Sequence, residues 1–219
     1  MTTCRNLIVV GAGGFGQEVI WAAKNLNSAR QSYNILGYCD DDPDKKGKMI
    51  YGYPVLGVPG EIDRACDSKP CFVCAIGNNR VRKSVVGRLL AMEWVPVTII
   101  DPSVIIAEHV QVGNGSYIGA GSILSPCSRI GNHVIINQHC SIGHDSILED
   151  FAQAAPGSRV SGAARIREGS MLGSNAAVAQ CLTVGRYSVL GACSFAATNI
   201  PDLVTAIGNP ARVIMTHKE

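Results

Sequence analysis

Two adjacent residues near the middle of the chain, His144 and Asp145, have side chains suited to acid–base chemistry. A free imidazole has a pKa of about 6.5, close to physiological pH, which makes histidine an efficient general base. A neighbouring carboxylate can increase the basicity of the ring or fix its orientation. The pair therefore predicts a site at which a proton is removed from a substrate, provided that the fold exposes the ring.

The segment that contains this pair repeats every six residues from Ile100 onward, without an insertion. The first position of each hexad is a branched aliphatic residue in fifteen of sixteen cases, with Ala154 as the exception. The fifth position is small or β-branched in every hexad except the one that contains Leu182. A fifth position and the next first position are two residues apart, so on a strand both side chains face the interior. The repeat predicts a solenoid of short strands and corners; a β-sandwich, with its period of two and irregular loops, is disfavoured.

The third and fourth positions of each hexad fall where the chain must turn, and many hexads have Gly, Asn or Asp there. His144 and Asp145 occupy a third and a fourth position, so we expect both at the surface. His109, His133 and His139 occupy fourth positions elsewhere, and we expect each of them to be a solvated surface residue.

The first part of the chain, residues 1–99, alternates strand-like and helix-like segments. Strands are predicted over residues 6–10, 35–39, 71–76 and 95–99, and helices over residues 17–25 and 79–92. Short strands separated by helices predict a parallel sheet with crossover connections. We therefore expect an α/β domain over residues 1–99 and an all-β repeat domain, with a C-terminal tail, over residues 100–219.

Three motifs of the first domain lie where α/β folds bind nucleotides. The glycine motif Gly11–Gly16 joins a predicted strand to a predicted helix, whose first amides would face a phosphate. The acidic residues 40–42 end the second strand and suit either a ribose or base contact or a solvated turn. Gly77 and Asn78 follow another strand. Fewer than one hundred residues make only half of a dinucleotide fold, so a mononucleotide or nucleotide sugar is favoured over the NAD of a dehydrogenase.

Composition excludes several other classes of protein. A net charge of +2, from 19 basic and 17 acidic residues, gives no basic stripe for nucleic acid. No apolar run is long enough for a signal peptide or a membrane span, which predicts a cytoplasmic protein. Nine cysteines, an odd number without a paired framework, suit free thiols in a reducing compartment. Cys71 and Cys74 match C-x-x-C, but their apolar surroundings favour a buried strand over a redox or metal site.

Three stretches of the sequence resemble one family. Residues 5–99, with Gly11–Gly16 and Ala75–Asn79, the stretch Asn137–Asp145, and the stretch Gly208–Arg212 resemble the bacterial sugar O-/N-acyltransferases, which are hexapeptide-repeat transferases. That family includes sialic acid O-acetyltransferases and the N-acetyltransferases of nucleotide-linked 4-amino sugars. The resemblance implies a left-handed parallel β-helix with three hexads per coil. It also implies a homotrimer with acetyl-CoA in the groove between subunits, no metal, and a role in polysaccharide biosynthesis.

The resemblance also assigns roles to residues. His144 would be the general base, Asp145 its partner, and Gly162 the donor of an N–H to the thioester oxygen. The residues implied for acetyl-CoA are Gln153, Gly162, Ser174 and Ala192. The residues implied for the nucleotide-linked sugar are Gly13, Gly14, Phe15, Asp40, Asp41, Gly77, Asn78 and Asn137. Some family members have histidine where this chain has Gln153, so a second titrating group near the thioester is absent here. Some also have histidine where this chain has Phe15, which puts a nucleotide contact at that position in doubt.

The implied activity is transfer of the acetyl group of acetyl-CoA to the amine of a nucleotide-linked 4-amino-4,6-dideoxy sugar, by direct attack on the thioester. O-acetylation of sialic acid or a related sugar is an alternative, because the same base would serve a hydroxyl. A non-catalytic nucleotide-sugar-binding protein would keep the fold without turnover. A zinc protein like the γ-class carbonic anhydrases is disfavoured, because the later histidine of that metal site is replaced here by Glu149.

Overall fold

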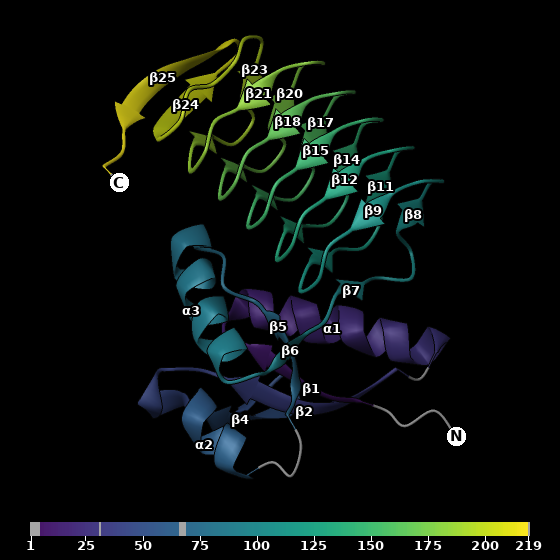
Figure 1. Ribbon diagram of the computed structural model, residues 1–219, viewed down its shortest axis with the longest axis vertical. Coiled ribbons are helices and arrows are strands. Elements are labelled where there is room, and N and C mark those ends of the chain that lie inside the picture. The colour runs from purple at the N-terminus through teal and green to yellow at the C-terminus, as the bar shows by residue number, and fades with distance from the viewer. Residues whose placement is uncertain (1–4, 31, 66–68, 219) are drawn as a thin grey trace. The chain divides into compact units, whose positions relative to one another are not determined.

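The computed structural model describes residues 5–30, 32–65 and 69–218. The chain divides into two compact units, residues 1–102 and residues 103–219. Figure 1 shows the helices and the sheet of the first unit and the stacked coils of the second. Among the described residues, no helix combines the length and the apolar character needed to cross a membrane.

The first unit is built around a six-stranded sheet with the order β3-β4-β2-β1-β5-β6. Its strands are β1 (Arg5–Val10), β2 (Tyr33–Cys39), β3 (Met49–Ile50), β4 (Tyr53–Gly57), β5 (Cys71–Cys74) and β6 (Val95–Pro96). All neighbouring strands are parallel except β3 and β4. The chain adds β2 and β4 on one side of β1 and then β5 and β6 on the other. The carboxyl ends of β1 and β5 therefore form a topological switch point, where open α/β sheets bind ligands.

Three helices connect these strands: α1 (Gly14–Ala29), α2 (Pro59–Ala65) and α3 (Asn79–Ala91). A short 3-10 helix, η1 (Pro43–Lys45), follows β2. The first helix is longer than the predicted 17–25, because it starts directly after Gly13 and a single apolar face extends it to the last turn. Its buried face consists of Gly16, Val19, Ile20, Ala22, Ala23 and Leu26.

The sequence missed the elements between residues 43 and 65, namely η1, β3, β4 and α2. These segments are short and rich in Lys, Asp, Gly and Pro, so neither a helical nor a strand period develops in them. The single strand predicted over 95–99 was also wrong, because the structure has two separate strands, β6 and β7 (Ile99–Ile100). Pro96 lacks the amide that would continue a ladder.

The second unit is a stack of two-residue strands, which are β8 (Ile105–Ile106), β9 (Gln111–Val112), β10 (Tyr117–Ile118), β11 (Ile123–Leu124), β12 (Arg129–Ile130), β13 (Ile135–Ile136), β14 (Ser141–Ile142), β15 (Ile147–Leu148), β16 (Gln153–Ala154), β17 (Arg159–Val160), β18 (Arg165–Ile166), β19 (Met171–Leu172), β20 (Ala177–Val178), β21 (Thr183–Val184), β22 (Val189–Leu190) and β23 (Phe195–Ala196). From β8 to β20 each pairs in parallel with the strand three further on, as Tyr117 does with Ile135. The strands form three sheets, so one coil takes three hexads and the predicted parallel β-helix is confirmed.

The interior of the β-helix holds the first and fifth positions of the hexads, as the period predicted. From Ile118 to Leu190 every first position is buried, and the fifth positions include buried serines. The serine hydroxyls donate to carbonyls of the next coil, for example from Ser122 to Asn137 at 2.8 Å and from Ser146 to Ser161 at 2.9 Å. These bonds satisfy the hydroxyls of most core serines, whereas the buried hydroxyl of Ser128 has no partner among the described residues.

Every corner of the β-helix uses the same backbone conformation. The fourth position has a positive φ in fifteen consecutive hexads, from His109 to Cys193, and eleven of these residues are not glycine. This left-handed conformation is costly for a residue with a side chain. The repeated stacking of the coils, and not the local residue preference, therefore imposes the corner geometry. The last coil continues into an antiparallel pair, β24 (Val204–Gly208) and β25 (Ala211–Thr216).

Candidate active site

His144 and Asp145 lie at the corner between β14 and β15, where they form a hydrogen-bonded pair. Nδ1 of His144 lies 2.8 Å from Oδ2 of Asp145, and both side chains are largely exposed, at 68% and 61%. A carboxylate accepts hydrogen bonds, so this contact places the ring proton on Nδ1 and leaves a lone pair on Nε2. The predicted proton-accepting imidazole is therefore exposed and orientated.

Gly162 lies directly beside this imidazole, one coil further along. The amide of Ala163 donates to the carbonyl of His144 at 2.8 Å, which stacks the two corners. A Cβ atom at position 162 would clash with Nε2 of His144 and lie 2.6 Å from Cε1. The ring therefore rests on the Cα atom of Gly162, and any side chain there would displace the ring. Among the described residues, the amide of Gly162 donates to no acceptor.

Ser174 and Ala192 lie on a different corner of the same chain. The amide of Cys193 donates to the carbonyl of Ser174 at 2.8 Å, so these residues stack on one another. This Ser174 corner (residues 138–139, 156–157, 174–175 and 192–193) follows the sheet that contains β13 and β16. The His144 corner (residues 108–109, 126–127, 144–145, 162–163 and 180–181) follows the sheet that contains β14 and β17. A single chain thus divides the residues expected at acetyl-CoA between two corners.

Gln153 and Asn137 lie in and beside the sheet formed by β13 and β16. Both are buried, with 7% and 8% exposure. The amide of Asn137 donates to the carbonyl of Ala154 at 2.9 Å, which places the two residues in adjacent coils. Among the described residues, neither side-chain carbonyl oxygen has a hydrogen-bond partner. Buried oxygens without a donor are rare in folded proteins, so both oxygens are unusual within this chain.

The expectation of solvated corner histidines held for His109 and His139, which are exposed, and was wrong for His133. His133 is only 5% exposed and its ring stacks on Phe151 with centroids 5.2 Å apart. The sequence hid this contact, because the two residues are three hexads apart and meet only when the coils stack.

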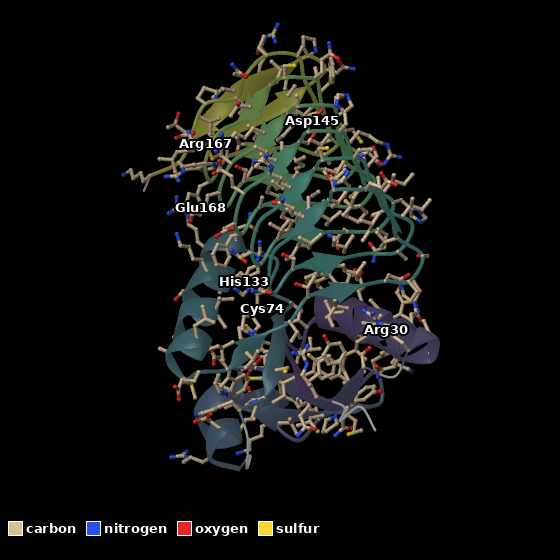
Figure 2. All side chains as sticks on the ribbon, turned by 45° about the vertical axis from the view of Figure 1, so that its right-hand side comes forward. Arg30, Cys74, His133, Asp145, Arg167 and Glu168 are labelled. Atoms are coloured by element: carbon tan, nitrogen blue, oxygen red, sulfur yellow. The ribbon has the colours of Figure 1, made fainter. Side chains whose placement is uncertain are left out.

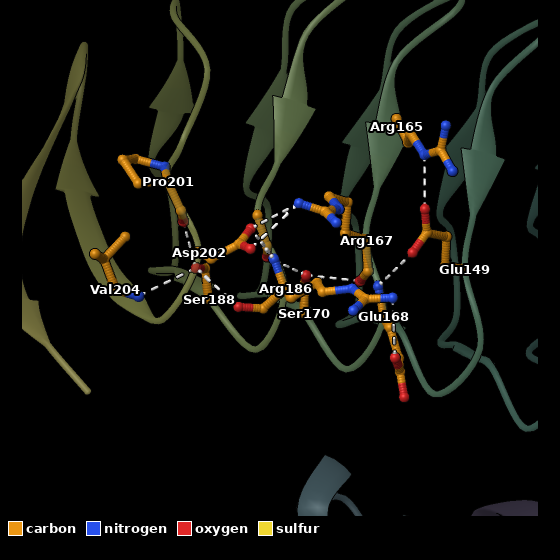
Figure 3. A network of polar contacts seen from close by, with 11 residues as sticks. Glu149, Arg165, Arg167, Glu168, Ser170, Arg186, Ser188, Pro201, Asp202 and Val204 are labelled. Carbon is orange, nitrogen blue, oxygen red and sulfur yellow. Dashed lines mark hydrogen bonds and ion pairs between the residues drawn. The ribbon is translucent and has the colours of Figure 1, made fainter. Parts of the chain in front are cut away.

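The third corner of the β-helix, here the Glu168 corner (residues 114–115, 132–133, 150–151, 168–169 and 186–187), is dense with paired charges (Figure 3). In Figure 2, Glu168 and Asp145 project from opposite sides of the coils. The ion pairs at and beside this corner are Arg165–Glu149 at 2.6 Å, Arg167–Asp202 at 3.0 Å and Arg186–Glu168 at 3.5 Å. The pairing of charges with one another indicates a structural role for this corner.

The first unit contains a cavity of about 200 Å³ at the carboxyl ends of its parallel strands. It lies at the topological switch point, and its lining residues are Val10, Gly11, Cys39, Asp40, Asp41, Pro59, Ile76, Val81 and Val85. Mostly apolar walls with two carboxylates at one side suit a flat heterocycle with a polar edge. The wall residue from α2 was missed because the sequence showed no helix there.

The glycines of the Gly11–Gly16 motif have two different functions. A Cβ atom on Gly11 would lie 2.9 Å from the carbonyl oxygen of Ala75, and one on Gly16 would clash with the carbonyl oxygen of Gly11. These two glycines are therefore required for packing. A Cβ atom on Gly13 or Gly14 would meet nothing within 4 Å. Gly13 caps α1 without a side-chain bond, which leaves open space at the helix N-terminus for an anion.

The carboxylate of Asp40 is used within the chain. Its Oδ2 accepts the amide of Ala12 at 2.8 Å and contacts Nζ of Lys45 at 3.0 Å, and its Oδ1 accepts the amide of Asp42 at 3.0 Å. Burial by itself would raise the pKa of Asp40, but these hydrogen bonds outweigh burial and lower it. Asp41 is exposed and pairs with Arg88 of α3. Asp40 therefore holds the loop, and Asp41 is the carboxylate more open to a ligand.

The remaining residues expected at the nucleotide have mixed surroundings. Gly77 is exposed, with nothing within 4 Å of a Cβ atom at that position. The side chain of Asn78 caps α3 by accepting the amides of Arg80 and Val81, each at 3.1 Å. Phe15 is half-buried in the first turn of α1. The structure thus explains Asn78 by helix capping and leaves Gly77 facing open space.

The C-x-x-C motif lies in the buried strand β5, as expected. Burial raises the pKa of Cys74 to about 12 and also raises that of Cys71, so both remain thiols. The seven described cysteines are all free. Among the described residues, no three His, Cys, Asp or Glu side chains are placed to hold a metal ion.

Comparisons with known proteins agree with both halves of this description. Residues 6–89 match the family described as the PglD N-terminal domain. The chain is 28% identical to GDP-perosamine N-acetyltransferase of Escherichia coli O157:H7 over 210 residues, which cover 93% of this chain and 94% of that relative.

Two solved structures share the fold over almost the entire length. One is the acetyltransferase domain of PglB from Neisseria gonorrhoeae FA1090 in complex with acetyl coenzyme A, with a TM-score of 0.87, 30% identity, and coverage of 96% of this chain and 100% of that chain. The other is a histidine-to-asparagine mutant of perosamine N-acetyltransferase from Caulobacter crescentus in complex with CoA and GDP-perosamine, with a TM-score of 0.88, 26% identity, and coverage of 96% and 97%. The chain therefore belongs to the bacterial sugar O-/N-acyltransferase family of hexapeptide-repeat transferases.

Proposed function

We propose that this protein transfers the acetyl group of acetyl-CoA to the amine of a nucleotide-linked 4-amino sugar. The observation that carries the proposal is the imidazole of His144, which is held by Asp145 at Nδ1 and presents Nε2 beside the open amide of Gly162. A proton acceptor next to an N–H donor is the arrangement that attack of an amine on a thioester requires. The two relatives that match over nearly their entire length are named as perosamine N-acetyltransferases.

The proposed reaction uses two groups of the chain. The neutral sugar amine attacks the thioester carbonyl carbon while Nε2 of His144 takes the proton that the nitrogen loses. The amide of Gly162 stabilises the negative charge that develops on the carbonyl oxygen. The C–S bond then breaks, and the imidazolium returns the proton to the CoA sulfur. Asp145 keeps the ring in the correct tautomer and stabilises the imidazolium.

We also propose that the active enzyme is a homotrimer. The division of the acetyl-CoA residues between the His144 corner and the Ser174 corner supports this proposal, because the groove would then combine the two corners from neighbouring subunits. Gly162 belongs to the first corner and Ala192 to the second. A monomer would present only half of such a groove.

The nucleotide is proposed to bind in the N-terminal α/β domain, which we place at residues 1–99. Its cavity lies at the switch point of the sheet, next to the Gly11–Gly16 motif and Asp41. GDP-perosamine is the sugar bound by the solved relative, and a sugar of that class is the proposed substrate here. A cytoplasmic location suits such a substrate and stays a prediction.

One experiment tests the activity and identifies the substrate. The protein is mixed with acetyl-CoA and UDP-, dTDP-, GDP- or CMP-linked sugars, each with a free amine, and release of free CoA thiol is followed. We expect turnover with one nucleotide class and a product heavier by one acetyl group. Matched sugars with a hydroxyl in place of the amine separate N- from O-acetylation. Nucleotide-sugar binding without thiol release in any mixture would show a binding protein instead of an enzyme.

A further inference from the structure

A nucleoside diphosphate that enters the cavity of the first unit meets carboxylates at its wall. Asp40 and Asp41 line this cavity, and Asp42 and Asp44 follow in the next turn. The negative charges of these carboxylates and of a diphosphate repel one another. Tight binding of a nucleoside diphosphate therefore requires a cation beside the glycine loop, and the motifs of the sequence supply none.

Lys45, the last residue of η1, places its ammonium group at this point. Its Nζ lies 3.0 Å from Oδ2 of Asp40, and the same oxygen accepts the amide of Ala12 at 2.8 Å. Because the ammonium and the Ala12 amide share one oxygen, Nζ lies next to the backbone of the glycine loop. The side chain of Lys45 is 33% exposed, so a ligand can reach it.

Two other cations near the cavity are also paired with carboxylates, but neither contacts the oxygen that accepts the Ala12 amide. Arg88 pairs with Asp41, and Lys46 pairs with Glu61 of α2 at 2.9 Å. An ammonium group has three N–H donors, so Lys45 can keep its bond to Asp40 and donate to phosphate oxygens as well. Charge-assisted bonds of this kind are among the strongest that a surface loop can form.

We propose that Lys45 holds the diphosphate of the nucleotide-linked sugar against the glycine loop, with Asp40 as the residue that positions its ammonium group. The open space at Gly13 and Gly14 accommodates the phosphate oxygens beside the first amides of α1. This role rests on the nucleotide-sugar function proposed above.

The test compares Lys45→Met with Lys46→Met, a neighbouring lysine whose ion pair lies away from the loop. Binding of UDP, dTDP and GDP to the full-length protein is measured by calorimetry at several salt concentrations. For the diphosphate that the wild type binds, we expect Lys45→Met to weaken affinity about tenfold or more and to reduce its salt dependence. Lys46→Met should stay within about twofold of the wild type, and Lys45→Arg should restore most of the affinity.

A second readout separates a phosphate contact from a structural defect. Affinity for uridine or guanosine, which lack phosphate, should be the same in the wild type and in Lys45→Met. Equal loss of nucleoside and diphosphate affinity would show that Lys45 only supports the fold, and unchanged diphosphate affinity would remove it from the site. A wild type that binds none of these three diphosphates, although it turns over a sugar in the thiol assay, would overturn the role of Lys45 without affecting the acetyl transfer.

Discussion

The His144 corner and the Glu168 corner of the β-helix have the same backbone conformation, but their backbone amides differ in whether they are hydrogen-bonded within the protein. Both have a positive φ at every fourth position, and both stack through amide-to-carbonyl bonds between coils. At the Glu168 corner, the amides of Asn114, Asn132, Glu168 and Arg186 each donate to a side-chain oxygen of a neighbouring coil or loop. Four of the five third-position amides of this corner are thus satisfied inside the protein, the exception among the described residues being that of Asp150.

At the His144 corner, the corresponding amides are open. Among the described residues, those of His144, Gly162 and Gln180 donate to no acceptor. Uncharged residues mostly replace the paired charges here, and the ring of His144 pairs with Asp145. The same repeated corner is therefore structural where its backbone amides donate to side-chain oxygens, and it is suited to chemistry where those amides have no acceptor within the chain.

The largest expected effect tests whether the open corner is the reacting one. His144→Asn should lower kcat by roughly two or more orders of magnitude, as loss of a general base does, with an unchanged circular dichroism spectrum. The matched control is His109→Asn, which changes an exposed histidine on the same corner, two coils earlier. An unchanged kcat in His144→Asn would remove this residue from the mechanism.

The next prediction tests the contact between the imidazole of His144 and the Cα atom of Gly162. Gly162→Ala should lower kcat about tenfold to a hundredfold, because its Cβ atom would displace the ring from its position. The control is the same change in a His144→Asn background, where the shorter side chain leaves room for a methyl group. A loss of the same size in both backgrounds would contradict the steric explanation.

The Glu168 corner should respond in the opposite way. Asp202 accepts the amide of Arg186 at 2.8 Å and pairs with Arg167 at 3.0 Å, so Asp202→Asn should lower the free energy of unfolding by about 1 kcal/mol. Turnover per folded molecule should stay at the wild-type level. Chemical denaturation measures the free energy of unfolding, and initial rates measure turnover. A fall in kcat without a loss of stability would contradict the structural role of the Glu168 corner.

The smallest effect extends the comparison to the first unit, where Asp40 caps the amide of Ala12 as Asp202 caps that of Arg186. The pKa of Asp40 is lowered in the folded protein, so its stabilising effect is present above the usual carboxyl pKa of about 3.9 and is lost as pH falls through the folded value. Asp40→Asn should therefore lower the melting temperature slightly at pH 7, and the difference from the wild type should vanish in acid. A difference that grows as pH falls would have the wrong sign.

The repeat domain could be predicted from sequence because its period is local. A first position and a fifth position lie on the same strand face regardless of what packs outside, so the interior followed from residue types alone. The segment from residue 43 to residue 65 could not be predicted in this way, because its short strand β4 is defined by pairing with β2 and has no period of its own.

The site divides in the same manner. The sequence placed His144 and Asp145 at an exposed corner, and the exposure of both side chains agrees with that prediction. It did not show the burial of His133, the capping role of Asn78 or the use of Asp40 inside the loop. Those features depend on neighbours that only folding brings into contact, or on a choice between two partners that the residue type leaves open.

The sequence by itself therefore determined the stacked coil, its apolar interior and the exposure of the imidazole, since all three follow from spacing along the chain. The tertiary structure decided what lies beside that imidazole. Gly162 meets the ring of His144 only because each coil takes three hexads, and the two corners expected at acetyl-CoA are separated for the same reason. Contacts between coils depend on the number of residues per turn of the solenoid, and a six-residue period leaves that number open.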